Sequence, residues 1–255
     1  MLPHHKWEIG ISAGSYYPDL TQEFWGNDIA LSYENDHMGM QFFGYSYHID
    51  ELTDEKLIAS RLFTLQLLLN GCLRIAWNSM HSCPVEFTCF AACNGGAIHS
   101  ISTSHIENFP FSANPKIDLE ESEYRPAKGK FSSHLLHLCK KDVALRSLIL
   151  QVGLITLSGA FQKIMTWGTL YKIYDTVKYY SKEYGYPIEK FADPKKIKDF
   201  HAACNNSLLL GPYARHGELG FKQPKSAITD LDEAVEVIIN FAGGFCRHYI
   251  NEKYP

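Results

Sequence analysis

The sequence predicts an α+β protein in which a small N-terminal sheet-plus-helix domain, residues 1–110, precedes a C-terminal all-α helical bundle, residues 132–255. Two patterns carry this prediction. Short segments rich in aromatic and β-branched residues gather in the N-terminal domain, as strands require. The second half carries apolar residues at helical spacing over longer segments. Between the two, residues 111–131 belong to a stretch with prolines, a charge run and a glycine, which is the composition of a linker.

Strand-like segments alternate with turn signals in the N-terminal domain. Five segments have the composition of strands: 7–12, 28–33, 38–47, 85–92 and 97–103. Turn-forming residues separate the members of two pairs, ENDH at 34–37 and NGG at 94–96. A long helix over 53–78, capped by Thr53, lies between the pairs. Its apolar residues lie on nearly all sides, so we expect it to pack on the sheet.

The second half predicts four helices, over about 132–151, 158–184, 195–206 and 229–250. Gly185 and Pro187 end the second helix, and Thr229 or Asp230 caps the last. We expect these two helices to pack together, because a helix gains most of its stability from such contacts. Six tyrosines crowd the second helix and its end: Tyr171, Tyr174, Tyr179, Tyr180, Tyr184 and Tyr186. Such rings either stack on nucleic-acid bases or, more commonly, pack between helices.

Composition narrows the class of protein. The chain has 255 residues, of which 45% are hydrophobic and 20% are charged, so a sizeable core is expected. The net charge of −4 gives no global attraction for nucleic acid. Residues 190–225 hold seven Lys/Arg against three Asp/Glu, a pattern typical of a solvated, loop-rich face. No secretion signal, long apolar run or disulfide framework is visible, so we expect a cytoplasmic protein that does not engage a membrane.

Signatures of several common chemistries are missing. The sequence contains no P-loop, Gly-x-Gly-x-x-Gly, Gly-x-Ser-x-Gly or His-Glu-x-x-His. Cysteines and histidines do gather in and beside one predicted hairpin: Cys72, Cys83, Cys89, Cys93, His99 and His105. A zinc site is the alternative that this group raises, but no Cys-x-x-Cys knuckle is present. Buried thiols commonly act as small apolar groups, and we expect no metal and no cofactor.

Residues 211–217, GPYARHG, contain an arginine beside a histidine, Arg215 and His216, a dipeptide that recurs as Arg247-His248. A guanidinium binds two phosphate oxygens and stabilises negative charge. An imidazole passes a proton near neutral pH. The pair therefore suits chemistry on a phosphodiester. The alternative is structural: Pro212 opens a helical turn, Gly217 closes it, and the arginine ties a helix–loop junction.

Several elements of the second half occur in an order that resembles a set of uncharacterised bacterial proteins. These elements are TWGTLYKIYDTV at 166–177, FHAACNNS at 200–207 and GPYARHG at 211–217, and the resemblance covers about 130–250. The shared feature is a Trp-x-x-Leu-Tyr-Lys-Ile-Tyr-Glu helix followed by an Asn and an Ala-Arg-His-Gly/Ala turn. More distantly, the pattern is similar to the HEPN superfamily, whose members are helical bundles, often dimeric and often metal-independent ribonucleases of toxin and antiviral systems.

The resemblance implies roles for particular residues. Arg215 and His216 would form the catalytic pair, although the two stand a few residues apart in most HEPN proteins and are adjacent here. Asn205 or Asn206 would be the polar partner, and Asp175 would orient the arginine. His216 would act as general acid or base, while Arg215 would stabilise charge on a phosphate attacked by the ribose 2′-OH.

The expected function is that of a HEPN-like, RNA-directed protein of a bacterial stress or antiviral defence system, with metal-independent endoribonuclease activity. The residues expected to bind substrate are Lys195, Lys198, Lys222 and Tyr213. RNA, a second copy of the chain and another protein are the candidate partners. The alternative is a non-catalytic binding or scaffold module in which the ARHG turn is structural. Exposure separates the two, since a catalytic pair opens onto a cleft and a structural pair is buried.

Overall fold

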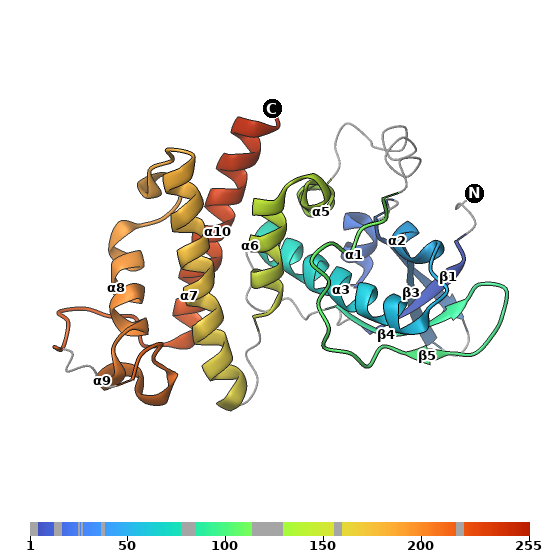
Figure 1. Cartoon of the computed structure of the whole chain (residues 1–255), viewed down its shortest axis with the longest axis horizontal. Coiled ribbons are helices and arrows are strands. Elements are labelled where there is room, and N and C mark those ends of the chain that lie inside the picture. Colours follow the sequence, from blue (N-terminus) through green and yellow to red (C-terminus); the bar gives the residue numbers. More distant parts are fainter. Residues whose placement is uncertain are drawn as a thin grey trace. The chain divides into compact units, whose positions relative to one another are not determined.

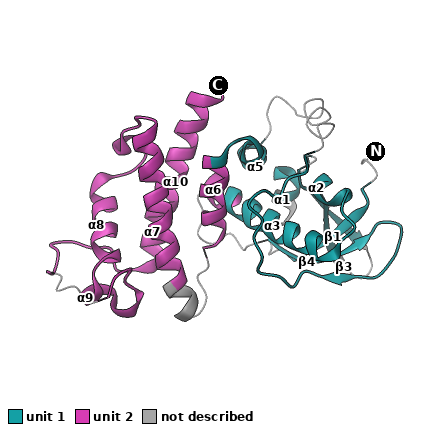
Figure 2. Cartoon of the chain, viewed as in Figure 1, with its two compact units in different colours: residues 1–72, 82–143 teal, residues 73–81, 144–255 magenta. Residues whose placement is uncertain are grey.

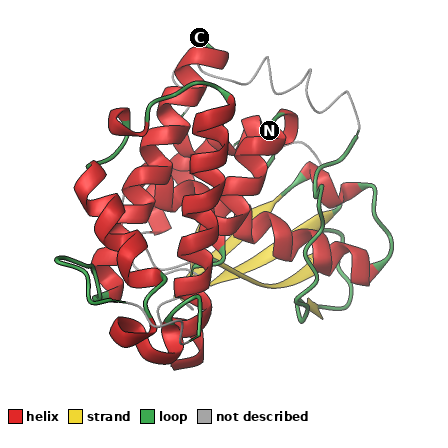
Figure 3. Ribbon diagram, turned by 60° about the vertical axis from the view of Figure 1, so that its left-hand side comes forward, coloured by secondary structure: helices red, strands yellow, loops and turns green. Residues whose placement is uncertain are grey.

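The computed structural model describes residues 5–12, 17–24, 26, 28–36, 39–77, 85–113, 130–155, 160–217 and 222–255. The chain divides into two compact units (Figure 2): unit 1 comprises residues 1–72 and 82–143, and unit 2 comprises residues 73–81 and 144–255. Figures 1 and 3 show that the strands of the described part belong to unit 1, whereas unit 2 is built from helices. The predicted α+β class, with the sheet first and the helical bundle second, is confirmed.

The sheet of unit 1 has five antiparallel strands in the order β2-β3-β1-β4-β5. Their bounds are β1 Trp7–Ser12, β2 Ala30–Asp36, β3 Gly39–Tyr45, β4 Glu86–Ala92 and β5 His99–Ser100. The central strand is β1, where Ile9 pairs with Gly44 of β3 and with Phe90 of β4. All five predicted strands are present, although the last is limited to two residues instead of spanning 97–103.

Side-chain alternation on β1 directs one face of the sheet into the core. Trp7, Ile9 and Ile11 are buried, and the residues between them are not, as the two-residue period of a strand requires. Helix α3, Glu55–Trp77, packs on the sheet (Figure 1). Its Asn70 side chain bonds both backbone groups of Val85, accepting from the N–H at 2.8 Å and donating to the carbonyl at 2.9 Å. These paired bonds fix α3 beside the start of β4.

The start of α3 differs by one residue from the expected cap. Asp54, rather than Thr53, accepts a hydrogen bond from the Lys56 N–H at 2.8 Å. A carboxylate at this position also suits the positive end of the helix dipole. The rest of the helix follows the prediction closely, because its continuous apolar surface is an unambiguous signal.

Three further helices complete unit 1: α1 Tyr17–Glu23, α2 Tyr47–Asp50 and α5 Phe131–Lys141. The sequence patterns did not predict α1 and α2, which are too short for a helical period to be read. The single helix predicted over 132–151 is two helices, α5 and α6, Val143–Gly153. They are separated by Asp142, whose backbone is extended at φ −119° and ψ 112°.

Unit 2 is a bundle around two long helices. Its elements after α6 are α7 Ala160–Glu183, η1 Ile188–Lys190, α8 Pro194–Cys204, α9 Ser207–Leu210, η2 Gly211–Tyr213 and α10 Leu231–Lys253. The predicted packing of α7 on α10 is confirmed. Ile173 of α7 and Phe241 of α10 are fully buried, and the rings of Tyr174 and Phe241 lie 6.3 Å apart. No helix of the described residues is long and apolar enough to cross a bilayer.

A glycine in the middle of α10 allows close packing inside this bundle. A Cβ atom on Gly244 would lie 2.6 Å from the Cβ atom and 2.7 Å from the carbonyl oxygen of Phe191. Glycine in a helix interior costs stability relative to alanine. The cost is offset here because only a bare backbone lets α10 approach the segment that follows η1.

The two units differ from the expected domains at two elements. Helix α5 groups with unit 1, where the Ser132 hydroxyl donates to the Glu23 carboxylate. The last turn of α3 groups with unit 2, where Arg74 Nη2 donates to the Ile155 carbonyl at 3.0 Å. In each case a side-chain hydrogen bond joins residues far apart in the sequence, which no local pattern reveals.

Candidate functional site

Helix α7 provides a buried aromatic platform beside the asparagine motif and the GPYARHG turn. Trp167, Tyr171 and Tyr174 are buried on it. Trp167 and Tyr171 are four residues apart, so their side chains are neighbours on one face of the helix. The fully buried Ile173 holds the platform in the bundle. The aromatic side chains therefore occupy fixed positions.

The GPYARHG turn is held to the end of α8 through its backbone. Gly211 has φ +55°, in the left-handed region that glycine enters without strain. Pro212 is the second residue of η2, where its fixed φ favours the helical turn. The Arg215 N–H then donates to the Cys204 carbonyl at 2.7 Å. This bond fixes the backbone of the turn, while the side chains of Arg215 and His216 remain exposed.

The guanidinium of Arg215 lies over the ring of Tyr171. The distance from its central carbon to the ring centre is 3.9 Å, which makes a cation–π contact. Stacking engages the face of the guanidinium and leaves the N–H donors on its edge available for an anion. An exposed arginine held in this way is suited to binding phosphate.

His201 of α8 is the group that the sequence patterns did not single out. Its Nε2 atom lies 3.4 Å from the Tyr171 hydroxyl and 3.2 Å from Nδ2 of Asn205. The same Asn205 amide nitrogen donates to the His201 carbonyl at 2.9 Å, which identifies it as the NH₂ group. Nε2 therefore faces a donor and is the unprotonated nitrogen of a neutral imidazole. The four residues Tyr171, His201, Asn205 and Arg215 are called the His201 cluster below.

The surroundings of His201 favour this neutral form. Burial lowers the pKa of His201 below its ordinary value, and the positive charges of Lys178 and Arg215 act in the same direction, while Asp175 opposes them. The imidazole consequently has its basic nitrogen free of a proton near neutral pH. A half-buried neutral histidine beside an exposed arginine is suited to accept a proton from a substrate hydroxyl.

The two asparagines of FHAACNNS have separate roles. Asn205 faces His201, and its Oδ1 atom is buried without a hydrogen-bond partner among the described residues. An unsatisfied buried acceptor is rare in folded proteins and is found at functional sites. Asn206 caps α9, accepting from the Leu208 N–H at 3.0 Å and donating to the Lys222 carbonyl at 3.2 Å. Asn205 is thus the asparagine of the site, and Asn206 holds the neighbouring loop.

Asp175 does not orient Arg215 through an ion pair between described residues, whereas His216 is exposed beside Arg215. Asp175 is exposed on α7, one turn beyond Tyr171, and forms no ion pair with Arg215 in the part of the chain that is described. The tyrosine ring, not the carboxylate, orients the guanidinium. His216 is exposed next to Arg215, and its side chain takes part in none of the hydrogen bonds between described residues. His216 is consequently free to meet a ligand.

The expected substrate-binding residues divide between two places. Lys195 and Lys198 are exposed on α8, and Lys198 lies one turn before His201 on the same side of that helix. Lys222 is exposed beyond the turn. Tyr213 instead lines a cavity beside Trp167. Lys178 is a further cation that the sequence patterns did not select, with its Nζ atom 5.6 Å from the centre of the Tyr174 ring.

The residues that the sequence patterns missed share a readable signal. His201 precedes Asn205 by four residues, the spacing that places two side chains on one face of a helix. Tyr171 has the same spacing from Trp167 and from Asp175. A search of the quoted motifs for polar residues four positions apart would have found His201 and Tyr171. The pattern that was used, an arginine directly followed by a histidine, selected only Arg215 and His216.

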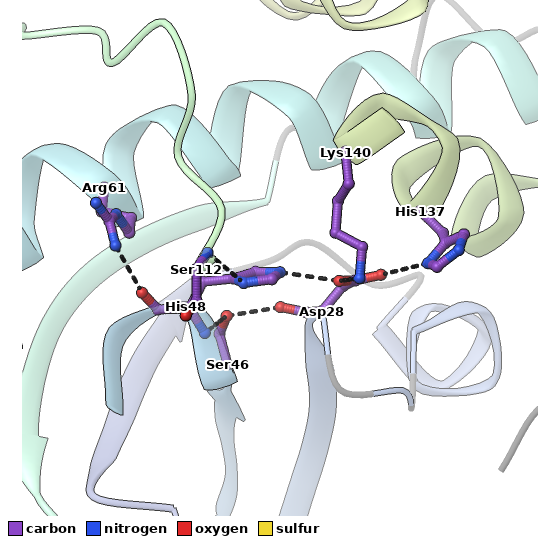
Figure 4. A network of polar contacts seen from close by, with 7 residues as sticks. All are labelled: Asp28, Ser46, His48, Arg61, Ser112, His137 and Lys140. Carbon is purple, nitrogen blue, oxygen red and sulfur yellow. Dashed lines mark hydrogen bonds and ion pairs between the residues drawn. The ribbon is translucent and has the colours of Figure 1, made fainter. Parts of the chain in front are cut away.

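A second polar cluster lies inside unit 1 and is centred on Asp28 (Figure 4). Its Oδ1 atom accepts from His48 Nε2 and from Lys140 Nζ, each at 2.8 Å, and its Oδ2 atom lies 3.5 Å from His137 Nδ1. The Ser46 hydroxyl donates to the Asp28 carbonyl at 2.6 Å. These five residues are called the Asp28 network.

The Asp28 network is closed to solvent. The side chains of Asp28, His48, His137 and Lys140 are 7%, 0%, 8% and 7% exposed. Nδ1 of His48 accepts from the Ser112 N–H at 3.0 Å, which fixes His48 as the neutral tautomer with its proton on Nε2. The side chains of the network are thus buried, and they join α5 to the segment that leads into β2.

The described residues contain no group of three or more His, Cys, Asp or Glu arranged to hold a metal ion. Of the hairpin cysteines, Cys89 is half-buried and Cys93 is exposed, while Cys83 lies outside the described residues. Cys204, next to the turn, is a buried thiol whose pKa burial raises, although Arg215 opposes this effect. The thiol stays protonated and is a poor nucleophile.

Comparison with known proteins adds no assignment: no family model, curated protein or solved structure matches the chain.

Proposed function

We propose that unit 2 carries an RNA-directed catalytic site of HEPN type, with metal-independent endoribonuclease activity in a bacterial stress or antiviral defence system. The observation that supports the proposal most directly is the His201 cluster. An exposed guanidinium stacked on Tyr171 lies beside a histidine whose pKa is lowered below its ordinary value. The cluster thus combines an anion-binding group on the turn after η2 with a base on α8.

These residues supply the groups needed to cleave RNA through its own 2′-hydroxyl. Neutral His201 takes the proton of the 2′-OH, whose oxygen attacks the neighbouring phosphorus. The P–O5′ bond breaks, leaving a 2′,3′-cyclic phosphate, and His216 in its protonated form gives a proton to the departing O5′. The Arg215 guanidinium stabilises the extra negative charge on the phosphate oxygens. The protein is unchanged once the proton on His201 is returned to His216 through solvent.

The order of motifs supports the same proposal. The tryptophan–tyrosine helix, the asparagine motif and the ARHG turn resemble the bacterial set described above, and all three contribute a residue to the His201 cluster. Lys178 and Lys198 provide positive charge on the two helices that flank the cluster. A polyanion approaching this face meets several cations before it reaches Arg215.

A cleavage assay with the full-length protein tests the proposal. The probe is an end-labelled single-stranded RNA of mixed sequence in buffer containing EDTA, together with its all-2′-deoxy analogue. We expect cleavage of the RNA to 2′,3′-cyclic phosphate ends and no cleavage of the analogue. His201→Ala and His216→Ala should each lower the rate by about 10²- to 10⁴-fold, the range of acid–base catalysis.

Matched substitutions exclude a general effect of removing a histidine. His105 is an exposed histidine of unit 1, so His105→Ala should leave the cleavage rate unchanged. Protein that neither cleaves nor binds the RNA would rule out the proposed activity, as would cleavage that survives both His201→Ala and His216→Ala.

A non-catalytic role for the turn is the second candidate, and one observation favours it. The Arg215 N–H bond to the Cys204 carbonyl and the stack on Tyr171 both tie the turn to the bundle. In that role, Arg215→Lys loses the planar fork of the guanidinium and lowers the melting temperature. In the catalytic role, the same change leaves the melting temperature nearly constant while RNA cleavage falls.

A further inference from the structure

A cavity of about 510 Å³ opens in unit 2 between α7, the α9–η2 segment and the start of α10. Its volume lies in the range of small-molecule sites. Apolar and aromatic side chains, including Trp167 and Tyr213, form part of its wall. On the other side it is lined by Thr229, Asp230 and Asp232. The cavity therefore presents flat apolar surface and hydrogen-bond acceptors to one ligand.

The aromatic wall is built from rings that are held in place. Trp167 is 4% exposed and stacks on Phe200, with ring centres 6.1 Å apart and planes at 14°. Tyr213 is half-buried on η2, directly after Pro212. Rings fixed in this manner lose little entropy when a planar ligand packs against them. Nucleic-acid bases are the planar groups that proteins most often bind in this way.

The cavity lies next to the His201 cluster, because α7 and the GPYARHG turn each contribute one residue to the cavity and one to the cluster. On α7, Trp167 lies one turn before Tyr171, so the cavity wall and the platform of Arg215 are neighbours on one helix face. On the turn, Tyr213 and Arg215 are separated by a single residue, Ala214, in an extended conformation. One helical turn is about 5.4 Å, which is comparable to the separation of a base from its own phosphate. A nucleotide bound at Arg215 therefore places a base at the cavity.

The acidic side of the cavity selects against a second phosphate. Asp230 Oδ1 is occupied as the cap of α10, accepting from the Glu233 N–H at 2.9 Å. Asp232 is exposed, and no hydrogen bond or ion pair between described residues involves its carboxylate. Carboxylates repel phosphate and accept hydrogen bonds from the amino groups of bases. Guanine offers an adjacent N1–H and amino group, which match the two oxygens of one carboxylate.

We propose that this cavity is a nucleobase subsite that prefers guanine, with Asp232 accepting from the Watson–Crick edge while the base packs against Trp167 and Tyr213. This inference rests on the proposed RNA-directed function. It states which base the protein prefers beside the phosphate at which the RNA is cleaved. Uracil has only one ring N–H, flanked by two carbonyl oxygens that the carboxylate repels. The subsite therefore excludes uracil more strongly than it excludes any other base.

Binding of mononucleotides to the full-length protein tests the subsite apart from cleavage. The probes are guanosine 5′-monophosphate and uridine 5′-monophosphate, each titrated calorimetrically. The variant is Asp232→Asn, which keeps the shape of the side chain but removes its charge and one acceptor. The matched control is Glu236→Gln, an exposed acid one turn further along α10 that does not line the cavity. Circular dichroism confirms that both variants are folded.

We expect the guanine nucleotide to bind at least about fivefold more tightly than the uracil nucleotide, the lower end of discrimination by such a contact. Asp232→Asn should abolish this ratio, and Glu236→Gln should preserve it. Equal affinities for the two nucleotides, absence of binding, or a ratio that survives Asp232→Asn would overturn the subsite. If the ratio behaves as expected but the protein cleaves no RNA, the subsite stands and the proposed ribonuclease activity fails.

Discussion

The Asp28 network and the His201 cluster both contain a histidine and a basic side chain, but they differ in their exposure to solvent. Each sets histidine beside a cation and a polar partner, and each joins segments distant in the sequence. In the Asp28 network, however, every side chain is at most 8% exposed and the carboxylate contacts three basic groups. In the His201 cluster, Arg215 is exposed and has no carboxylate partner in the described chain.

Because of this difference in exposure, we expect the Asp28 network to stabilise the fold and the His201 cluster to bind a ligand. A buried charge that loses its partner costs several kcal/mol, so the Asp28 network can change little without unfolding unit 1. An exposed arginine is screened by water and contributes little to stability, but its charge remains available to a ligand. The comparison predicts large effects on stability from the first cluster and small ones from the second.

The largest expected effect is that of Lys140→Met. This substitution removes the ion pair between Lys140 Nζ and Asp28 Oδ1 in the core, while the contacts of Asp28 with His48 and His137 remain. We expect the free energy of unfolding of unit 1 to fall by about 3 kcal/mol, as for other buried pairs that lose one member. Chemical denaturation followed by circular dichroism measures the change.

Two further variants make this prediction specific. Lys195→Met removes an exposed lysine and should change stability by less than about 0.5 kcal/mol. Asp28→Asn combined with Lys140→Met removes both charges, so it should be less destabilised than Lys140→Met alone. If Lys140→Met and Lys195→Met are equally stable, the Asp28 network has no structural role.

The next largest effect is that of Arg215→Ala on unit 2. The backbone bond to Cys204 survives, and only the stack on Tyr171 is lost. An exposed cation–π contact contributes about 0.5 to 1 kcal/mol, so the free energy of unfolding should fall by that amount. RNA cleavage should disappear. If Arg215→Ala lowers the free energy of unfolding as much as Lys140→Met does, Arg215 has a structural role. The expected difference in stability between the two clusters would then be wrong.

A smaller effect is expected from pH, and its sign follows from His201. Burial lowers the pKa of His201 in the native state, so the unfolded chain binds the proton first as the pH falls. Its contribution to stability is complete above the ordinary histidine pKa of about 6.5 and is lost as the pH falls through the native value. His201→Gln should remove this part of the pH dependence of the unfolding free energy.

Nuclear magnetic resonance measures the pKa of His201 directly. The His201 imidazole should titrate below about 6.5, and Asp175→Asn should lower its midpoint further, since Asp175 raises the pKa. A midpoint above the ordinary value would show that the imidazole is charged at neutral pH and cannot serve as the base.

The smallest effect is predicted for Asp175→Asn on stability. The carboxylate is exposed and makes no ion pair with Arg215 in the described part of unit 2. We expect the unfolding free energy to change by less than about 0.5 kcal/mol. A double-mutant cycle with Arg215→Lys should show no coupling between the two residues. Coupling above about 0.5 kcal/mol would mean that the two side chains do interact in solution.

The contrast between the clusters also explains what the sequence could predict. Helices α7 and α10 and strand β1 follow from periodic apolar residues, because one face of each is buried. Helix α3 follows from its continuous apolar surface. The exposure of Arg215 and His216 agrees with the Gly- and Pro-bounded turn that contains them. His201 and Tyr171 lie in quoted motifs, yet their meeting depends on how α7 and α8 pack.

The Asp28 network shows where sequence reasoning ends. Its members come from three segments: Asp28 precedes β2, Ser46 and His48 belong to α2 and its N-cap, and His137 and Lys140 lie on α5. The segments are separated by up to about 110 residues, and none of the five residues stands in a motif quoted above. A buried lysine and a buried histidine look like surface residues in the sequence, since both types are mostly exposed. The break at Asp142 was missed because the apolar residues on both sides of it continue the helical period.

The division of α3 between the two units affects the order in which the units can fold during synthesis of the chain. Arg247 Nη2, near the end of α10, donates to the Ile75 carbonyl at 3.0 Å, and both residues belong to unit 2. Translation produces Ile75 well before Arg247, whereas the last residue assigned to unit 1 is Val143. Unit 1 can thus fold cotranslationally while unit 2 must wait for its last helix to leave the ribosome. A fragment that begins at residue 144 omits Ile75, and expression of unit 2 alone calls for a permuted chain that restores residues 73–81.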